Sequence, residues 1–125
     1  MAIHTQLPIY RAAYALLDTV TDVVKNMPRD FKRTIGEKIT IECIDIMVLV
    51  FRANVAADKS PHLAELLERL QVIELLLRLG MDKRLIARAA YAGAIEQTTS
   101  IGKQANGWKK STERRPLHEG QGRHD

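Results

Sequence analysis

The chain has 125 residues, and its 19 Lys and Arg against 15 Asp and Glu give a formal net charge of +4. This length suits one domain with its own core, and an apolar fraction of 46% argues against disorder of the whole chain. Aromatic residues make up only 5%, which favours helices packed through aliphatic side chains over a β-sandwich.

The first predicted helix begins at Pro8 and ends near Met27. Apolar residues recur there at alternating spacings of three and four, and proline suits a first helical turn. Pro28 disfavours helical geometry at Met27, so a second helix is predicted from about Pro28 to Ala57. Its β-branched middle resembles a buried strand. However, the pattern continues for about thirty residues without a turn signal, far beyond a usual strand length of ~5–6 residues.

This second helix is apolar on two faces. One face holds Ile39, Cys43, Ile46, Met47 and Val50, and the other holds Ile44, Val48, Phe51 and Val55. A helix that is apolar on two sides must be covered on two sides. We expect the bundle core to cover one face and a neighbouring helix or another subunit to cover the second.

The third predicted helix begins with Ser60 as N-cap and Pro61 in its first turn. Leucines continue it to Gly80, which we expect to end the helix at the C′ position. Asp82 is the predicted N-cap of a fourth helix, rich in small residues, that reaches about Trp108.

Residues 1–110 are therefore expected to form an all-α domain, an antiparallel up-down-up-down four-helix bundle. Its surplus apolar surface predicts a symmetric homo-oligomer, and the family resemblance described below implies that this oligomer is ring or barrel-like. Residues 111–125 combine mixed charge with a proline and two glycines, which predicts a disordered polar tail.

Catalytic chemistry is not indicated. The histidines lack metal-ligand spacing, no Glu-x-x-His pair occurs in the bundle, and no Gly-rich phosphate loop is present. Gly36, Gly93 and Gly102 are interpreted as places where another backbone approaches closely. The only cysteine excludes an internal disulfide. We predict no enzyme, no cofactor and no metal, and the lack of a signal-peptide pattern or apolar span predicts a cytoplasmic protein.

Basic side chains are concentrated in two places. Between Lys25 and Ile39, Arg29, Lys32 and Arg33 share one side of the predicted helix, in first turns where the helix dipole favours acids. Part of this charge can be neutralised within the helix, because Arg33–Glu37 and Lys38–Glu42 are spaced i,i+4. An anionic partner and a solvated face both remain open for this stretch.

The second basic cluster surrounds the predicted turn at Gly80. It consists of Arg78, Lys83, Arg84 and Arg88. In an antiparallel bundle the start of the second helix, the end of the third and the start of the fourth lie at one pole. Such a surface suits phosphate-backbone contact or an acidic protein face. No motif that reads RNA or DNA sequence accompanies it.

The sequence also resembles a known family. MPRDFKRTIGEKI, RAN at residues 52–54, LLERLQVIELLLRL and IGKQANGW are similar to the bacterial four-helix-bundle family named for open reading frames in ribosomal RNA intervening sequences. The resemblance covers about Tyr10 to Trp108. Its most specific parts are P-x-x-F-x-x-x-x-G-E from Pro28 to Glu37 and the closing IG…GW.

Within that family the chain most resembles the accessory variability proteins (Avd) of diversity-generating retroelements. The resemblance implies a barrel-like homopentamer with basic surfaces that bind a reverse transcriptase and nucleic acid, either template RNA or cDNA, during mutagenic retrohoming. We expect the binding residues to be Arg29, Lys32, Arg33, Arg78, Lys83, Arg84 and Arg88. The alternative is a structural or scaffolding bundle with no nucleic-acid role.

Overall fold

The computed structural model describes the backbone of residues 3–122 and the side chains of residues 3–113. A short 3-10 turn, η1 (His4–Gln6), precedes helix α1 (Pro8–Val24). A second helical segment follows, composed of α2 (Arg29–Phe31), the π-helical turn η2 (Lys32–Gly36) and α3 (Glu37–Val55). Helices α4 (Ser60–Asp82) and α5 (Arg88–Gly122) complete the chain, and residues 3–122 contain no strand.

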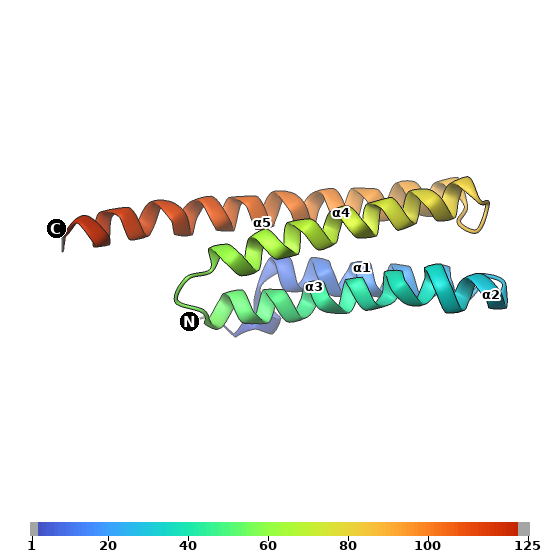
Figure 1. The fold of residues 1–125 in the computed structure, drawn as a ribbon, viewed down its shortest axis with the longest axis horizontal. Coiled ribbons are helices and arrows are strands. Elements are labelled where there is room, and N and C mark those ends of the chain that lie inside the picture. The colour runs from blue at the N-terminus through green and yellow to red at the C-terminus, as the bar shows by residue number, and fades with distance from the viewer. Residues whose placement is uncertain (1–2, 123–125) are drawn as a thin grey trace.

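Successive long helices run in opposite directions, as Figure 1 shows. α3 packs against α1 and α4, and α5 packs against α4 and α1, so the four helices enclose one core. The predicted all-α four-helix fold is therefore confirmed. Among the described residues, none of the helices has the length and hydropathy needed to cross a bilayer.

Aliphatic side chains from all four helices fill the core. Leu16 of α1, Ile46 of α3, Ile73 of α4 and Ile101 of α5 are each at most 1% exposed. Burying a side chain of this size contributes about 1.5–3 kcal/mol relative to leaving it in water. Each of the four long helices therefore contributes to the one core.

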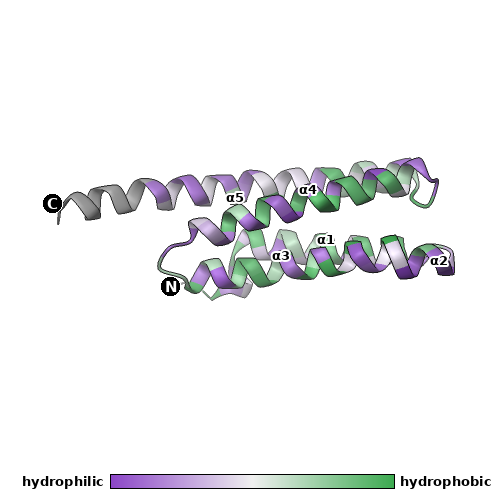
Figure 2. Cartoon of the chain, in the orientation of Figure 1, coloured by the Kyte–Doolittle hydropathy of each residue, from purple (hydrophilic) through white to green (hydrophobic). Residues whose placement is uncertain are grey.

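Of the two apolar faces predicted for α3, one is buried in the core and the other is exposed. The exposed face is a stripe of side chains 39–49% exposed: Ile41, Ile44, Val48, Phe51 and Val55. On the neighbouring helix α4, Leu75 and Leu79 are also exposed. Figure 2 shows the hydrophobic colouring on both α3 and α4. Contiguous apolar surface of this kind marks an interaction site in a folded protein.

Helix α5 continues beyond Trp108 to Gly122, through most of the segment for which the sequence predicts a disordered tail. The first residues of that segment belong to the bundle, because Glu113 accepts hydrogen bonds from Ser60 (2.8 Å) and Lys109 (2.8 Å). The side chains of residues 114–125 and the backbone of residues 123–125 lie outside the described part. The predicted boundary at residue 110 and the predicted disorder beyond it stay predictions.

Candidate nucleic-acid interface

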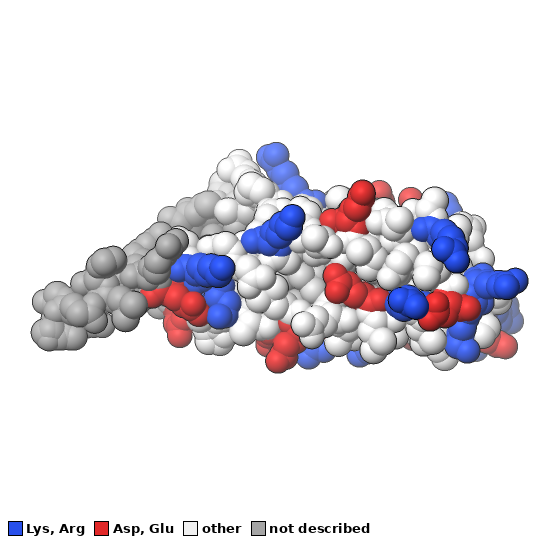
Figure 3. Space-filling view, turned by 90° about the horizontal axis from the view of Figure 1, so that it is seen from above, with Lys and Arg blue, Asp and Glu red and all other residues white. Residues whose placement is uncertain are grey.

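The seven predicted binding residues lie at one end of the bundle. In Figure 1, α2 and the connection between α4 and α5 lie together at the end opposite the N-terminus. We call this surface the basic end and define it by Arg29, Lys32, Arg33, Arg78, Lys83, Arg84 and Arg88, all of them exposed. On the face that Figure 3 shows, Lys and Arg side chains gather at this end, with acidic side chains among them. The expected convergence is present, whereas the role of these residues in binding stays a prediction.

Among the described side chains, only one of the seven has an acidic partner. Arg78 donates from Nε to Asp82 Oδ1 at 3.1 Å, one helical turn away, and this hydrogen bond raises the pKa of the guanidinium. Within the described part of the chain, no hydrogen bond or ion pair is formed by the side chains of the other six. Their charge is therefore available to an external anion.

The expected ion pair between Arg33 and Glu37 is absent from the described side chains, whereas Lys38 and Glu42 do pair, at 2.9 Å. The reason is the π-helical turn η2, which ends immediately before Glu37. A π turn closes hydrogen bonds to the fifth residue, so side chains four apart within it are no longer stacked. The local geometry thus leaves Arg33 unneutralised.

A close contact with α1 fixes the segment that carries Arg29, Lys32 and Arg33 to the bundle. A Cβ added to Gly36 would lie 2.6 Å from Val24 Cγ1 and 3.4 Å from Met27 Sδ. Gly36 therefore permits close packing, as predicted, although the atoms that approach it belong to side chains and not to another backbone. The same prediction is wrong for Gly93 and Gly102 within the described chain, because a Cβ would meet nothing within 4 Å at Gly93 and only an ordinary contact at Gly102.

The turn between α4 and α5 differs from the prediction. Gly80 does not end α4, and Asp82 does not cap α5, because α4 continues to Asp82 and α5 begins at Arg88. Gly80 is instead buried under Ile86, whose Cδ1 would lie 2.6 Å from a Cβ at position 80. The glycine is needed for close packing of the turn, and a different residue supplies the left-handed conformation.

That residue is Arg84, which has a φ of 61°. Its amide donates to Met81 O at 2.9 Å, and the amide of Leu85 donates to Gly80 O at 2.8 Å. This pair of hydrogen bonds is a Schellman motif with Arg84 at C′, a position that glycine usually occupies. Arg84 is the only non-glycine residue with positive φ in the described backbone.

Comparison with known proteins decides the family. A family model described as bAvd-like matches residues 7–112, which include both basic segments and all four long helices up to Thr112. The chain belongs to the bAvd-like family. This match confirms the resemblance drawn from the sequence, and it extends slightly beyond the predicted limits at both ends. No curated protein matches the chain.

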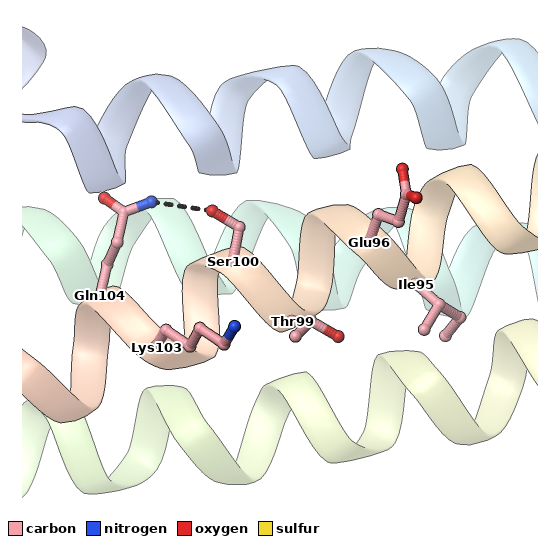
Figure 4. Close-up of a pocket in the computed structure, with 6 residues that line it drawn as sticks. All are labelled: Ile95, Glu96, Thr99, Ser100, Lys103 and Gln104. Atoms are coloured by element: carbon pink, nitrogen blue, oxygen red, sulfur yellow. Dashed lines mark hydrogen bonds between the residues drawn. The ribbon is translucent and has the colours of Figure 1, made fainter.

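The bAvd-like family is an accessory, non-catalytic family. Among the described residues, no group of three His, Cys, Asp or Glu side chains is placed to hold a metal. The hollow in Figure 4 is lined from a single helix, α5, where Gln104 donates to Ser100 Oγ at 3.2 Å. Glu96 and Lys103 in this hollow point in different directions. These two side chains therefore form no acid–base pair in the hollow.

Sequence reasoning missed a buried ionic cluster. The Glu42 side chain is 1% exposed and accepts hydrogen bonds from Arg69 Nη1 at 3.3 and 3.4 Å, in addition to its pair with Lys38. The Lys38 pair has an i,i+4 signal in the sequence. The Arg69 pair joins α3 to α4 over 27 residues, and no local pattern predicts it.

A second missed feature closes the opposite end of the bundle. Lys59 Nζ donates to the carbonyls of Ala53 (2.9 Å), Asn54 (3.2 Å) and Ala56 (2.9 Å), and so caps the end of α3. The same ammonium lies 5.9 Å from the centroid of the Trp108 ring. The ammonium group of Lys59 is therefore already hydrogen bonded within the bundle, unlike the six cations of the basic end that have no described partner.

Proposed function

We propose that this bAvd-like protein is a non-enzymatic accessory protein of a diversity-generating retroelement. It binds the element's reverse transcriptase and nucleic acid, template RNA or cDNA, and so supports mutagenic retrohoming in the cytoplasm. Family membership supports the accessory role. The observation that carries the binding role is the set of six exposed cations at one end of the bundle that have no ion-pair partner among the described side chains.

The basic end suits phosphate groups because its charge comes from several elements and faces water. Each Lys or Arg that neutralises a phosphate releases condensed counterions, so affinity falls steeply as salt rises. The sequence shows no motif that reads RNA or DNA bases beside these cations. Contacts to the backbone, without sequence reading, are the expected mode.

Self-association is part of the proposal. The exposed stripe on α3, together with Leu75 and Leu79, provides the apolar surface that a second copy covers. We propose a closed, barrel-like homopentamer, which repeats the basic end once per subunit. Several copies acting on one nucleic-acid strand raise the overall affinity without any new contact.

Charge reversal tests the binding role. Arg29→Glu, Lys32→Glu and Arg33→Glu are combined in one variant, and the control combines Arg11→Glu, Lys103→Glu and Lys110→Glu, three exposed cations outside the basic end. Both variants have the same net charge. Fluorescence anisotropy with labelled single-stranded RNA and DNA, at two salt concentrations, measures affinity. We expect the first variant to bind at least roughly 100-fold more weakly than the control at low salt.

Three further measurements complete the test. Circular dichroism and light scattering must show the same helicity and subunit number in both variants. Co-purification with the reverse transcriptase of a diversity-generating retroelement tests the protein partner. Equal affinities of the two variants, or no binding by the wild type at low salt, would contradict the nucleic-acid role and favour a scaffold.

A further inference from the structure

The turn between α4 and α5 contains an arginine in a conformation that arginine disfavours. For an L-residue other than glycine, the left-handed region is unfavourable because Cβ lies too close to the following carbonyl oxygen. Arg84 adopts it at the C′ position of α4, with a φ of 61°. Glycine at this position would keep both Schellman hydrogen bonds, because these use only backbone atoms. Nothing in the folding of the turn therefore requires an arginine side chain.

The side chain also contributes no contact that offsets this cost. Arg84 is exposed, and within the described residues its guanidinium has no acidic or carbonyl partner. The neighbouring acid, Asp82, is already hydrogen bonded to Arg78. Strained residues without a structural role are concentrated at functional sites, where the rest of the fold holds them in place.

The surrounding structure fixes this turn in place, and residues of the turn line an open hollow. Ile86 is 4% exposed and packs directly on Gly80, which fixes the turn to the end of α4. Arg84 and Arg88 both line a hollow whose other walls are Met81, Asp82, Ile86 and Ala87. Two guanidinium groups on a rigid frame suit a planar, bidentate acceptor such as a phosphate.

We infer that the hollow of the α4–α5 turn binds a phosphodiester of the nucleic-acid backbone and that Arg84, assisted by Arg88, is its principal contact. This inference rests on the proposed nucleic-acid role and names the contact point within the basic end. Arg84 thereby lowers the stability of the protein and raises its affinity for nucleic acid. The two effects can be separated by substitution.

Two substitutions separate strain from charge. Arg84→Gly removes both the strain and the guanidinium, whereas Arg84→Ala removes the guanidinium and keeps a Cβ at positive φ. Lys110→Gln is the control, since it removes one exposed cation elsewhere on the chain. We expect Arg84→Gly to raise the melting temperature by about 2–5 °C. Arg84→Ala should leave it near the wild-type value.

Binding should fall in both Arg84 variants. Titration of a labelled single-stranded oligonucleotide over a range of salt concentrations gives the affinity and its salt slope. We expect affinity to fall by about tenfold and the slope of log K against log salt to decrease by about 0.7, the value for one lost phosphate contact. Lys110→Gln should change neither quantity. Polyglutamate, a competitor without phosphate, should displace the oligonucleotide poorly from the wild type.

Each result has a defined meaning. If the wild type binds and Arg84→Gly binds with the same affinity and slope, the inference is wrong while the proposed function stands. Efficient displacement by polyglutamate would show that the hollow does not prefer phosphate over the carboxylates of an acidic protein segment, and this result would overturn the inference. Failure of the wild type to bind any oligonucleotide at low salt would remove the proposed nucleic-acid role together with this contact.

Discussion

The contact of Gly36 with α1 permits a quantitative prediction about stability. Alanine is favoured over glycine inside a helix by about 1 kcal/mol when the added methyl group has room. At Gly93 a Cβ would meet nothing within 4 Å, so Gly93→Ala should raise the free energy of unfolding by about that amount. At Gly36 the same methyl would lie 2.6 Å from Val24 Cγ1.

The methyl at position 36 cannot be accommodated by a small rotation. Carbon atoms in contact normally lie about 3.5–4.0 Å apart, so a shift of roughly 1 Å is needed. Val24 ends α1, and a β-branched side chain has one strongly preferred rotamer in a helix, which means that the helices themselves must separate. Overpacking of this kind costs about 1–3 kcal/mol. After the helix-propensity gain, Gly36→Ala should lower the free energy of unfolding by about 1 kcal/mol.

Urea denaturation followed by circular dichroism, at one fixed protein concentration, measures both variants. We expect their midpoints to move in opposite directions, with a difference of about 2 kcal/mol between them. Unchanged m-values would show that both still unfold from the same compact state. If Gly36→Ala stabilises the protein as much as Gly93→Ala does, the inference that Gly36 packs closely on α1 is wrong.

Three further changes test the interior and the far end of the bundle. Glu42→Ala should lower the free energy of unfolding by about 2–3 kcal/mol in urea denaturation, because it removes a buried carboxylate that joins α3 to Arg69; a loss below about 0.5 kcal/mol would contradict this. Burial, and secondarily the Glu42 carboxylate, raises the pKa of Cys43 from 9.0 to about 12, so the thiol should react with a disulfide reagent only after unfolding. Because the unfolded thiol ionises first, wild-type stability should be unaffected by this group below pH 9 and should fall by about 1.4 kcal/mol per pH unit between pH 9 and 12, relative to Cys43→Ala; parallel pH profiles would refute the shift. Lys59→Ala should cost about 1 kcal/mol by uncapping α3 and should change the fluorescence of Trp108, the only tryptophan, so an unchanged emission spectrum would count against the contact.

The proposed binding and the proposed self-association use different parts of one bundle. The apolar stripe runs along the length of α3, whereas the unpaired cations occupy one tip. Self-association through the side of each bundle would leave the tips open. Substitutions in the stripe, such as Val48→Glu, should therefore change the subunit number in light scattering. Substitutions at the tip should change binding.

The sequence by itself determined the helices and the buried face of α3. Apolar spacing of three and four depends only on the 3.6-residue helical repeat, so α1 could be read from Pro8 onward, and the inward face of α3 was identified correctly. Prolines marked the starts of helices for another local reason, because proline suits a first helical turn. The convergence of two basic segments also followed from the sequence, because antiparallel connection of four helices brings those segments to one end.

The tertiary structure alone decided how individual side chains are used. Arg69 meets Glu42 across two helices, and Gly80 is filled by Ile86, because helix packing sets distances that spacing along the chain does not encode. The turn closes over Gly80, and Arg84 therefore adopts the left-handed conformation. Glycine adopts this conformation more easily, so the sequence favoured Gly80 for that position. A local pattern specifies which face of a helix is apolar. Which partner each charged group meets depends on the relative placement of whole helices.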